Sequence, residues 1–237
     1  MIYSKANLVA VDIVKSDKSI PALDNLHLRA DGGTIAANGS CIIAVSPVNE
    51  TERAKVPLTS SSMIDEAETV SSETVREVLR GMPRDTLFAG TLEHCDYSGG
   101  RFTLTDGKRS RSISARTYPR EYIDYRAIFK RTGKTCEVHK IAINLRRLTD
   151  VLNTLDKMFP DSSKNLPVYL SFTDDDSVCI RCADVYGRQR ALCVMRSYSG
   201  VEGKWLIPNE WEKKLCDSPA DTSTSAARKI NKKKRTA

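Results

Sequence analysis

The sequence predicts an α+β fold built from about three repeats of one unit, in which a strand is followed by a helix and then by a meander of three antiparallel strands. Two observations predict it. Three helix candidates begin near Ser4, Ser71 and Asn144, at spacings of 67 and 73 residues. After each of them, alternating apolar segments and turn residues recur in the same order. Such a unit buries one face of its sheet beneath its helix, so neighbouring units are expected to pack side by side in layers.

The first two helices are marked by different signals. The segment from Ser4 to Val14 contains β-branched residues that also suit a strand, so only its place in the repeat favours a helix. The second helix has a capping serine at Ser71 or Ser72 and is stopped by Gly81 and Pro83. Its apolar residues recur at helical spacing and are Val75, Val78, Leu79 and Met82. We therefore expect one buried face on this helix.

The third helix candidate begins at Asn144 and ends before Pro160. Its leucines recur at spacings of three and four residues and are Leu145, Leu148, Leu152 and Leu155. Polar side chains lie off this stripe and are Arg146, Arg147, Asn153 and Lys157. This pattern predicts an amphipathic helix that presents cations on its open face.

The strands of each meander are predicted from apolar residues at alternate positions. These are Leu26 and Leu28 in the first repeat, Phe102 and Leu104 in the second, and Leu166, Val168, Leu170 and Phe172 in the third. Each repeat then has an acidic or glycine-bearing turn followed by a turn that ends in glycine. The first kind lies at 31–33, 98–100 and 174–176, and the second at 38–39, 106–107 and 186–187.

The spacing of the repeats predicts the domain organisation. Residues 1–130 are expected to form a complete domain of two repeats, residues 131–198 a third repeat that amounts to half a domain, and residues 199–237 a C-terminal extension. Two segments interrupt the pattern: a polar connection at 49–68, and residues 117–135, which bridge to the third repeat. In the extension, 205–215 suits a short helix, and the composition from Ser218 onward predicts a disordered basic tail.

Composition bounds the class of protein. No run approaches the roughly 18 apolar residues of a membrane helix, and the first residues lack the apolar core of a signal peptide. The seven cysteines are odd in number and scattered, which favours reduced thiols in a soluble cytoplasmic protein. Cys179 and Cys182 form a single CxxC, but strand alternation would direct their side chains to opposite faces. We therefore expect no metal and no cofactor.

The net charge of +7 is concentrated at the C-terminus. Six cations without an acid occupy the last ten residues and are Arg228, Lys229, Lys232, Lys233, Lys234 and Arg235. The rest of the chain carries 31 basic and 30 acidic residues. A DNA-binding surface on the body would therefore need charges segregated onto one side. The tail would bind phosphates without sequence preference, while a localisation signal or a solubilising segment explains it equally well.

Four segments resemble the bacterial replicative sliding clamp, the beta subunit of DNA polymerase III. Residues 19–28 (SIPALDNLHL) are similar to its TLPILxNLLL stretch, and residues 70–83 (VSSETVREVLRGMP) to its VPARKFFDICRGLP helix. Residues 118–126 (YPREYIDYR) resemble its FPDYR linker with three inserted residues, and residues 192–196 (LCVMR) its terminal VVMPMRL strand. The resemblance extends over roughly residues 4–198 and implies a DNA-clamp-like fold.

The number of repeats departs from this family. The resemblance implies a ring of twelve repeats, and four copies of a three-repeat chain would reach that number, so we expect a homo-oligomer. A monomeric relative fits the count equally well. So does a half-domain that another chain completes across an open sheet edge.

The resemblance also implies a function and the residues that perform it. The chain would be a non-catalytic processivity factor, a sliding-clamp-like DNA-binding accessory that tethers proteins of DNA replication or transcription without reading base sequence. The helix cations that would contact phosphates are Arg76, Arg80, Arg146, Arg147 and Lys157, with Lys5, Lys15 and Arg84 behind them. Alternatively, these cations pair with Glu73, Glu77 and Asp150 on their own helices, which gives an ordinary solvated face.

Other functions remain open. Family clamps bind polymerase peptides near the last strand, where Val194, Met195 and Arg196 map, although a core position beside a surface cation explains these residues as well. The chain could instead be an interaction module, of viral or mobile-element origin, that binds host replication proteins. A third hypothesis is a nucleic-acid hydrolase with a dispersed site. The histidines at 27, 94 and 139 have no nearby nucleophile, so we predict no catalytic residue.

Overall fold

The first repeat begins with a strand that leads directly into a helix. The structure is a computed structural model, and it describes residues 1–14, 20–50, 67–82, 93–105, 109–119, 122–131, 143–160, 166–173, 177–184 and 187–197. In it, β1 (Ile2–Ser4) precedes α1 (Lys5–Val9). Ser4 and Asn7 cap α1 reciprocally, each side chain accepting from the other's backbone N–H. A 3₁₀ turn, η1 (Ala10–Ile13), continues α1, which confirms a helix where propensity alone was ambiguous.

The meander of the first repeat follows a second 3₁₀ turn, η2 (Pro21–Asp24). Its strands are β2 (Asn25–Leu28), β3 (Thr34–Ala37) and β4 (Cys41–Val45). Gly32, between β2 and β3, has a φ of 89°, a left-handed conformation that explains the glycine in this turn. The sequence therefore predicted both the strands and the turn chemistry of this repeat.

The second repeat has the same order. β5 (Glu68–Ser71) leads into α3 (Ser72–Gly81), and the hydroxyl of Ser71 accepts a hydrogen bond from the Thr74 N–H as the predicted cap. The meander consists of β6 (His94–Ser98), β7 (Arg101–Thr105) and β8 (Ser110–Ser114).

The third repeat follows an element that the sequence did not lead us to expect. A helix, α4 (Tyr125–Arg131), lies within the segment 117–135, for which the sequence predicted only a bridge to the third repeat. The repeat itself has α5 (Leu145–Met158), capped by Asn144, and β9 (Val168–Phe172), β10 (Ser177–Ala183) and β11 (Arg190–Arg196). The strand expected before α5 lies outside the described residues.

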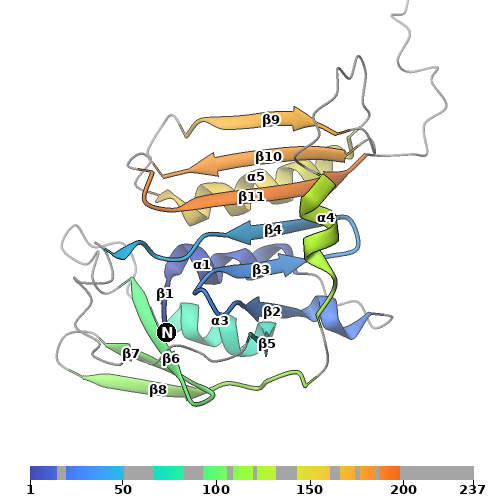
Figure 1. The fold of residues 1–237 in the computed structure, drawn as a ribbon. Coiled ribbons are helices and arrows are strands. Elements are labelled where there is room, and N and C mark those ends of the chain that lie inside the picture. Colours follow the sequence, from blue (N-terminus) through green and yellow to red (C-terminus); the bar gives the residue numbers. More distant parts are fainter. Residues whose placement is uncertain are drawn as a thin grey trace, which may run out of the picture. The chain divides into compact units, whose positions relative to one another are not determined.

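The strands form two antiparallel sheets, which confirms the predicted fold class (Figure 1). One sheet has four strands in the order β1-β6-β7-β8, and the other has seven in the order β5-β2-β3-β4-β11-β10-β9. The first two repeats exchange strands: β1 pairs with β6 of the second repeat, and β5 pairs with β2 of the first. β4 pairs with β11, so the third repeat continues the sheet of the first.

The helices of the repeats share one side of the sheets. α1 contacts both α3 and α5, and α4 crosses the opposite side of the seven-stranded sheet (Figure 1). We call these the helix side and the outer side. A large core lies on the helix side and a smaller one beneath α4. Cys182 belongs to the first core and Cys179 to the second, so the two cysteines of the CxxC do lie on opposite faces.

Candidate functional site

The predicted DNA-contacting cations on the helix side fall into two groups, and the first already has partners. Lys157 Nζ lies 2.7 Å from Asp12 Oδ2, and Lys5 Nζ lies 3.9 Å from Glu93 Oε1. The half-buried Arg76 donates to the Ser72 hydroxyl at 3.2 Å and to the Val14 carbonyl at 3.3 Å. These side chains therefore hold neighbouring elements together, and they would have to exchange those contacts to bind phosphate.

The second group is exposed. Arg80 on α3 and Arg146 and Arg147 on α5 form no ion pair with any described residue. Of the acids that the sequence offered as partners, Glu73 and Glu77 pair with other residues. An uncompensated guanidinium on a solvated helix face is free to contact phosphate oxygens.

Two arginines at and just beyond β8 explain why Arg80 has no acidic partner within its helix. Arg116 Nη1, just beyond β8, lies 3.2 Å from Glu73 Oε2, and Arg111 Nη2 lies 3.1 Å from Glu77 Oε1. Both acids of α3 are thus neutralised from a neighbouring segment instead of from within the helix. The pairs proposed within α3, from Glu73 to Arg76 and from Glu77 to Arg80, do not form.

Several predicted residues cannot be placed. Lys15, Arg84 and the whole extension after residue 197 lie outside the described residues. This includes the expected helix at 205–215 and the tail cations Arg228, Lys229, Lys232, Lys233, Lys234 and Arg235. Their contribution to DNA binding stays a prediction.

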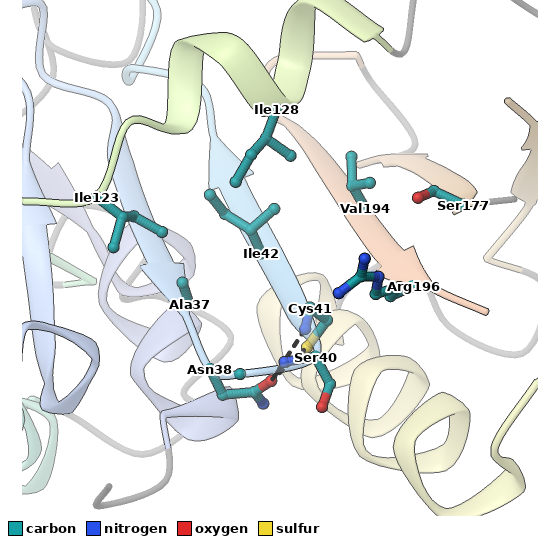
Figure 2. Close-up of a pocket in the computed structure, with 11 residues that line it drawn as sticks. Ala37, Asn38, Ser40, Cys41, Ile42, Ile123, Ile128, Ser177, Val194 and Arg196 are labelled. Carbon is teal, nitrogen blue, oxygen red and sulfur yellow. Dashed lines mark hydrogen bonds between the residues drawn. The ribbon is translucent and has the colours of Figure 1, made fainter. Parts of the chain in front are cut away.

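A pocket of about 350 Å³ opens on the outer side, between α4 and the strands β4 and β11 (Figure 2). In Figure 2, Ile123 and Ile128 reach from the α4 segment toward Ile42 of β4 and Val194 of β11. These four residues make the walls apolar. The pocket is therefore suited to an apolar side chain of a bound molecule.

Polar groups stand at one end of the pocket. The Asn38 side-chain oxygen accepts from the backbone N–H groups of Ser40 and Cys41, which fixes the turn between β3 and β4. Exposed Arg196 also lines the pocket. An apolar cleft with a cation at its rim fits a peptide that carries an apolar residue beside an acidic one.

The structure divides the three residues that the sequence suggested for partner binding. Val194 and Arg196 line the pocket, whereas Met195 is fully buried on the helix side. Alternation along β11 causes this division, because successive side chains point to opposite faces. Met195 is a core residue on the helix side and does not line the pocket.

An aromatic cluster anchors the α4 segment to the sheet. The His27 ring of β2 stacks on Tyr122 with the ring centres 4.9 Å apart, and Tyr125 lies at 5.5 Å. His27 Nδ1 lies 3.1 Å from the Thr69 hydroxyl. Burial, and then the nearby cation Arg29, lower the pKa of His27 to about 4, so the ring is neutral at pH 7.

The α4 wall of the pocket was missed in the interpretation of the sequence, although a signal was present. Tyr122, Tyr125 and Phe129 follow one another at spacings of three and four residues. This spacing is typical of a helix with one apolar face. The segment was interpreted only as a bridge to the third repeat.

Metal-ligating residues and cysteines were the candidates for reactive groups among the described residues. Within the described part of the chain, no three His, Cys, Asp or Glu side chains are placed to hold a metal ion. Burial raises the pKa of the Cys182 thiol to about 11 and that of Cys95 further still, so both stay protonated. None of the helices searched within these residues is long and apolar enough to cross a membrane.

Comparison with known proteins identifies similar folds among solved structures. No family model and no curated protein matches the sequence. The chain is similar to a putative DNA polymerase III beta subunit from Eubacterium rectale, at 11% identity and a TM-score of 0.47, covering 91% of this chain and 67% of that one. It is also similar to the DNA polymerase III beta subunit of Thermotoga maritima, at 12% identity and a TM-score of 0.49, covering 88% and 67%.

A third similar structure is A. fulgidus PCNA, described as bound to the C-terminal region of FEN-1. The identity is 11%, the TM-score is 0.46, and the match covers 85% of this chain and 98% of that one. The first two structures belong to the family whose motifs the sequence resembles. At such identities the likeness concerns the fold alone.

Proposed function

We propose that this chain is a sliding-clamp-like accessory factor that binds DNA through its helix side, without sequence preference, and tethers a replication or transcription protein. The observation that carries the proposal is the set of three exposed arginines, Arg80, Arg146 and Arg147, on helices that share one side of the sheets. Guanidinium groups on helices contact phosphates and carry no base readout unless they enter a groove.

The charge distribution predicts weak contact with DNA. Most other cations on the helix side already face acids, as Lys157 faces Asp12 and Arg111 faces Glu77. Only a few phosphates would therefore be neutralised, and affinity should fall with added salt by the corresponding small slope. Such contact suits a tether that remains close to DNA while it moves.

Charge reversal on the helix side tests the proposal. The full chain carrying Arg80→Glu, Arg146→Glu and Arg147→Glu is titrated with a fluorescent DNA duplex at several salt concentrations. We expect weaker binding, and we expect the slope of log K against log salt to shrink by about 0.9 for each phosphate that the variant no longer neutralises.

A matched control carries the same charge change on the outer side. Lys130, Arg181 and Arg190 are exposed there, and their replacement by Glu removes three cations and adds three acids in the same way. This variant should keep the wild-type salt slope. Equally weakened binding in the two variants would refute a DNA-binding helix side. If both bind normally and deletion of 228–237 abolishes binding, the tail is the DNA-binding element.

Tethering requires more than affinity, so retention on DNA of different topology is the second test. The protein is incubated with closed circular DNA, washed at high salt, and the DNA is then linearised. Retention that linearisation releases supports a closed assembly around DNA. Protein that dissociates equally from circular and linear DNA binds only from the side.

A second candidate function is docking of a protein partner through the outer pocket. The pocket favours it because apolar walls from Ile42, Ile123 and Val194 lie beside the exposed cation Arg196. The ligand would be a short extended segment with an apolar side chain and a neighbouring carboxylate.

Peptides of this chemistry test the pocket. Fluorescent peptides with two adjacent apolar residues and an acidic flank are titrated against the wild-type chain, Val194→Asp and Arg196→Glu. Both substitutions should weaken binding, while Lys130→Glu, a charge change on α4 whose side chain is not among the pocket-lining residues, should have little effect. Binding that ignores Val194 and Arg196 would rule out this pocket as the docking site.

A further inference from the structure

The outer side of the third repeat carries a row of side chains that do not line the outer pocket. Cys179 of β10 belongs to the core beneath α4, and Arg181 lies two residues further along the strand, so its side chain points to the same side. Arg181 pairs in register with Tyr169 of β9 and with Leu192 of β11. Tyr169, Arg181 and Leu192 therefore form one row across three neighbouring strands, about 10 Å long at the usual strand spacing.

Most of this row is open to solvent. Tyr169 is 69% exposed, Arg181 is exposed, and Leu192 is half-buried at the margin of the core beneath α4. Arg190, two residues before Leu192 on β11, adds a second exposed guanidinium on the same side. Tyrosine and arginine are among the side chains that contribute most to binding energy at protein interfaces.

The charge of this face is positive. Arg190 is the diagonal neighbour of Arg181 across β10 and β11, which places their Cα atoms roughly 7–8 Å apart. Arg190 forms no ion pair with any described residue. Asp184, the acid that follows β10, is held by Arg188 at 2.8 Å. A carboxylate bound between Arg181 and Arg190 would offset the repulsion between the two cations.

Arg181 is already oriented for such a contact. Its Nη1 donates to the Ser171 hydroxyl of β9 at 2.7 Å. A guanidinium has five N–H donors, so this hydrogen bond leaves others for a carboxylate, which arginine can bind through two parallel hydrogen bonds. Because the side chain is held before binding, less rotational freedom is lost when the contact forms.

We propose that this face, formed by Tyr169, Arg181, Arg190 and Leu192, binds an acidic segment of a partner protein. The segment places an apolar side chain against Leu192 and Tyr169 and carboxylates on the two arginines. Charge complementarity favours this class of partner. The face is separate from the helix side and from the outer pocket, so it stands or falls independently of the two functions proposed above.

Two other occupants fit less well. Two cations neutralise few phosphates, and Tyr169 is the only large aromatic side chain that is exposed among the described residues, so a nucleic-acid strand would find a single stacking position. A second copy of this chain would bring the same arginines against each other in a twofold contact, and like charges repel.

Selection from a display library of short random peptides tests the proposal. The full wild-type chain captures peptides, and those that also bind the Arg181→Glu/Arg190→Glu double variant are removed, which discards ligands of every other surface. The remaining peptides should be enriched in Asp and Glu around an apolar or aromatic residue. Fluescent-labelled synthetic copies should bind the double variant roughly tenfold or more weakly than the wild type, and added salt should weaken their binding.

The matched control variant is Arg101→Glu/Lys130→Glu, which makes the same change of charge at two exposed cations elsewhere and should bind these peptides like the wild type. Tyr169→Ala should weaken binding severalfold, since it removes an anchor of the face without changing its charge. Circular dichroism checks that each variant is folded. If the double variant does not fold, Arg190→Glu alone carries the same test.

Four outcomes overturn the proposal. They are a selection that yields no peptide, peptides without acidic enrichment, a labelled oligothymidylate that binds the wild type and not the double variant, and a dimer in sedimentation that the double variant dissociates. The third outcome assigns the face to single-stranded nucleic acid, and the fourth assigns it to a second copy of this chain.

Discussion

Acidification should destabilise the protein through His27, because the folded state binds the proton of this residue poorly. The pKa of His27 is lowered from 6.5 to about 4. Its imidazole lies beside Tyr122 and Tyr125 and faces two cations, Arg29 and Arg126. A base whose pKa falls on folding contributes stability that is fully present above pH 6.5. That stability is lost as the pH falls toward 4.

The size of the effect follows from the two pKa values. The linkage relation between these two pKa values gives a loss of about 2 kcal/mol at pH 5, and a limit of about 3 kcal/mol below pH 4. For a domain whose total stability is on the order of 5–15 kcal/mol, this is a large fraction.

This loss of stability is measured by urea unfolding of the wild type and of His27→Phe, each at about pH 7.5 and about pH 5. Phenylalanine keeps the stacking on Tyr122 and removes the titration, and its loss of the Thr69 hydrogen bond affects both pH values equally. The wild type should lose about 2 kcal/mol more than the variant between these conditions. Equal losses of stability in the two proteins would refute the assignment of the proton to His27. Because α4 forms a wall of the outer pocket, peptide binding there should weaken over the same pH range.

Three further predictions concern the fold and the helix side. Gly32→Ala should lower the free energy of unfolding in urea by about 1 kcal/mol or more, because the φ of Gly32 is 89° and a Cβ would lie 3.0 Å from the Met1 sulfur. Gly39→Ala is the control and should change this free energy little, since a Cβ there would have no atom within 4 Å. Ile180→Ala should cost about 2–5 kcal/mol in the same measurement, because the side chain is fully buried. Arg111→Ala should change stability by less than about 1 kcal/mol, since its pair with Glu77 is exposed. The same variant should weaken DNA binding by uncovering the Glu77 carboxylate on α3, and unchanged DNA affinity would argue against contact at that helix.

The sequence predicted where helices begin and where turns lie, because helix caps and turns depend on residues that are close together in the chain. Ser71 and Asn144 cap the helices where the sequence placed their first residues, and Gly32 forms its turn. The first helix needed the repeat pattern as well. Its β-branched residues are held in helical form by burial against the sheets.

The candidate sites were less predictable because they join residues far apart in the chain. Glu73 pairs with Arg116 and not with the arginine three positions along, since β8 packs beside α3 and the residues that follow it offer a closer cation. The outer pocket combines β4, the α4 segment and β11, of which only the last was suggested by the sequence. Strand exchange between repeats likewise leaves no local signature, because either strand would carry the same apolar pattern in its own sheet.

The exchange of strands between repeats also governs the order in which the chain can fold. Ile2 of β1 pairs with Asp96 of β6, and Cys41 of β4 pairs with Met195 of β11. These two strands of the first repeat therefore cannot form these pairings until residues much later in the chain have been synthesised. Pairings so distant in sequence slow folding, since the chain gives up its loop-closure entropy before the strands pair. Until β11 leaves the ribosome, the apolar β4 strand stands as an unpaired edge. Nascent chains are therefore most exposed to mispairing late in synthesis, when their first repeat is still incomplete.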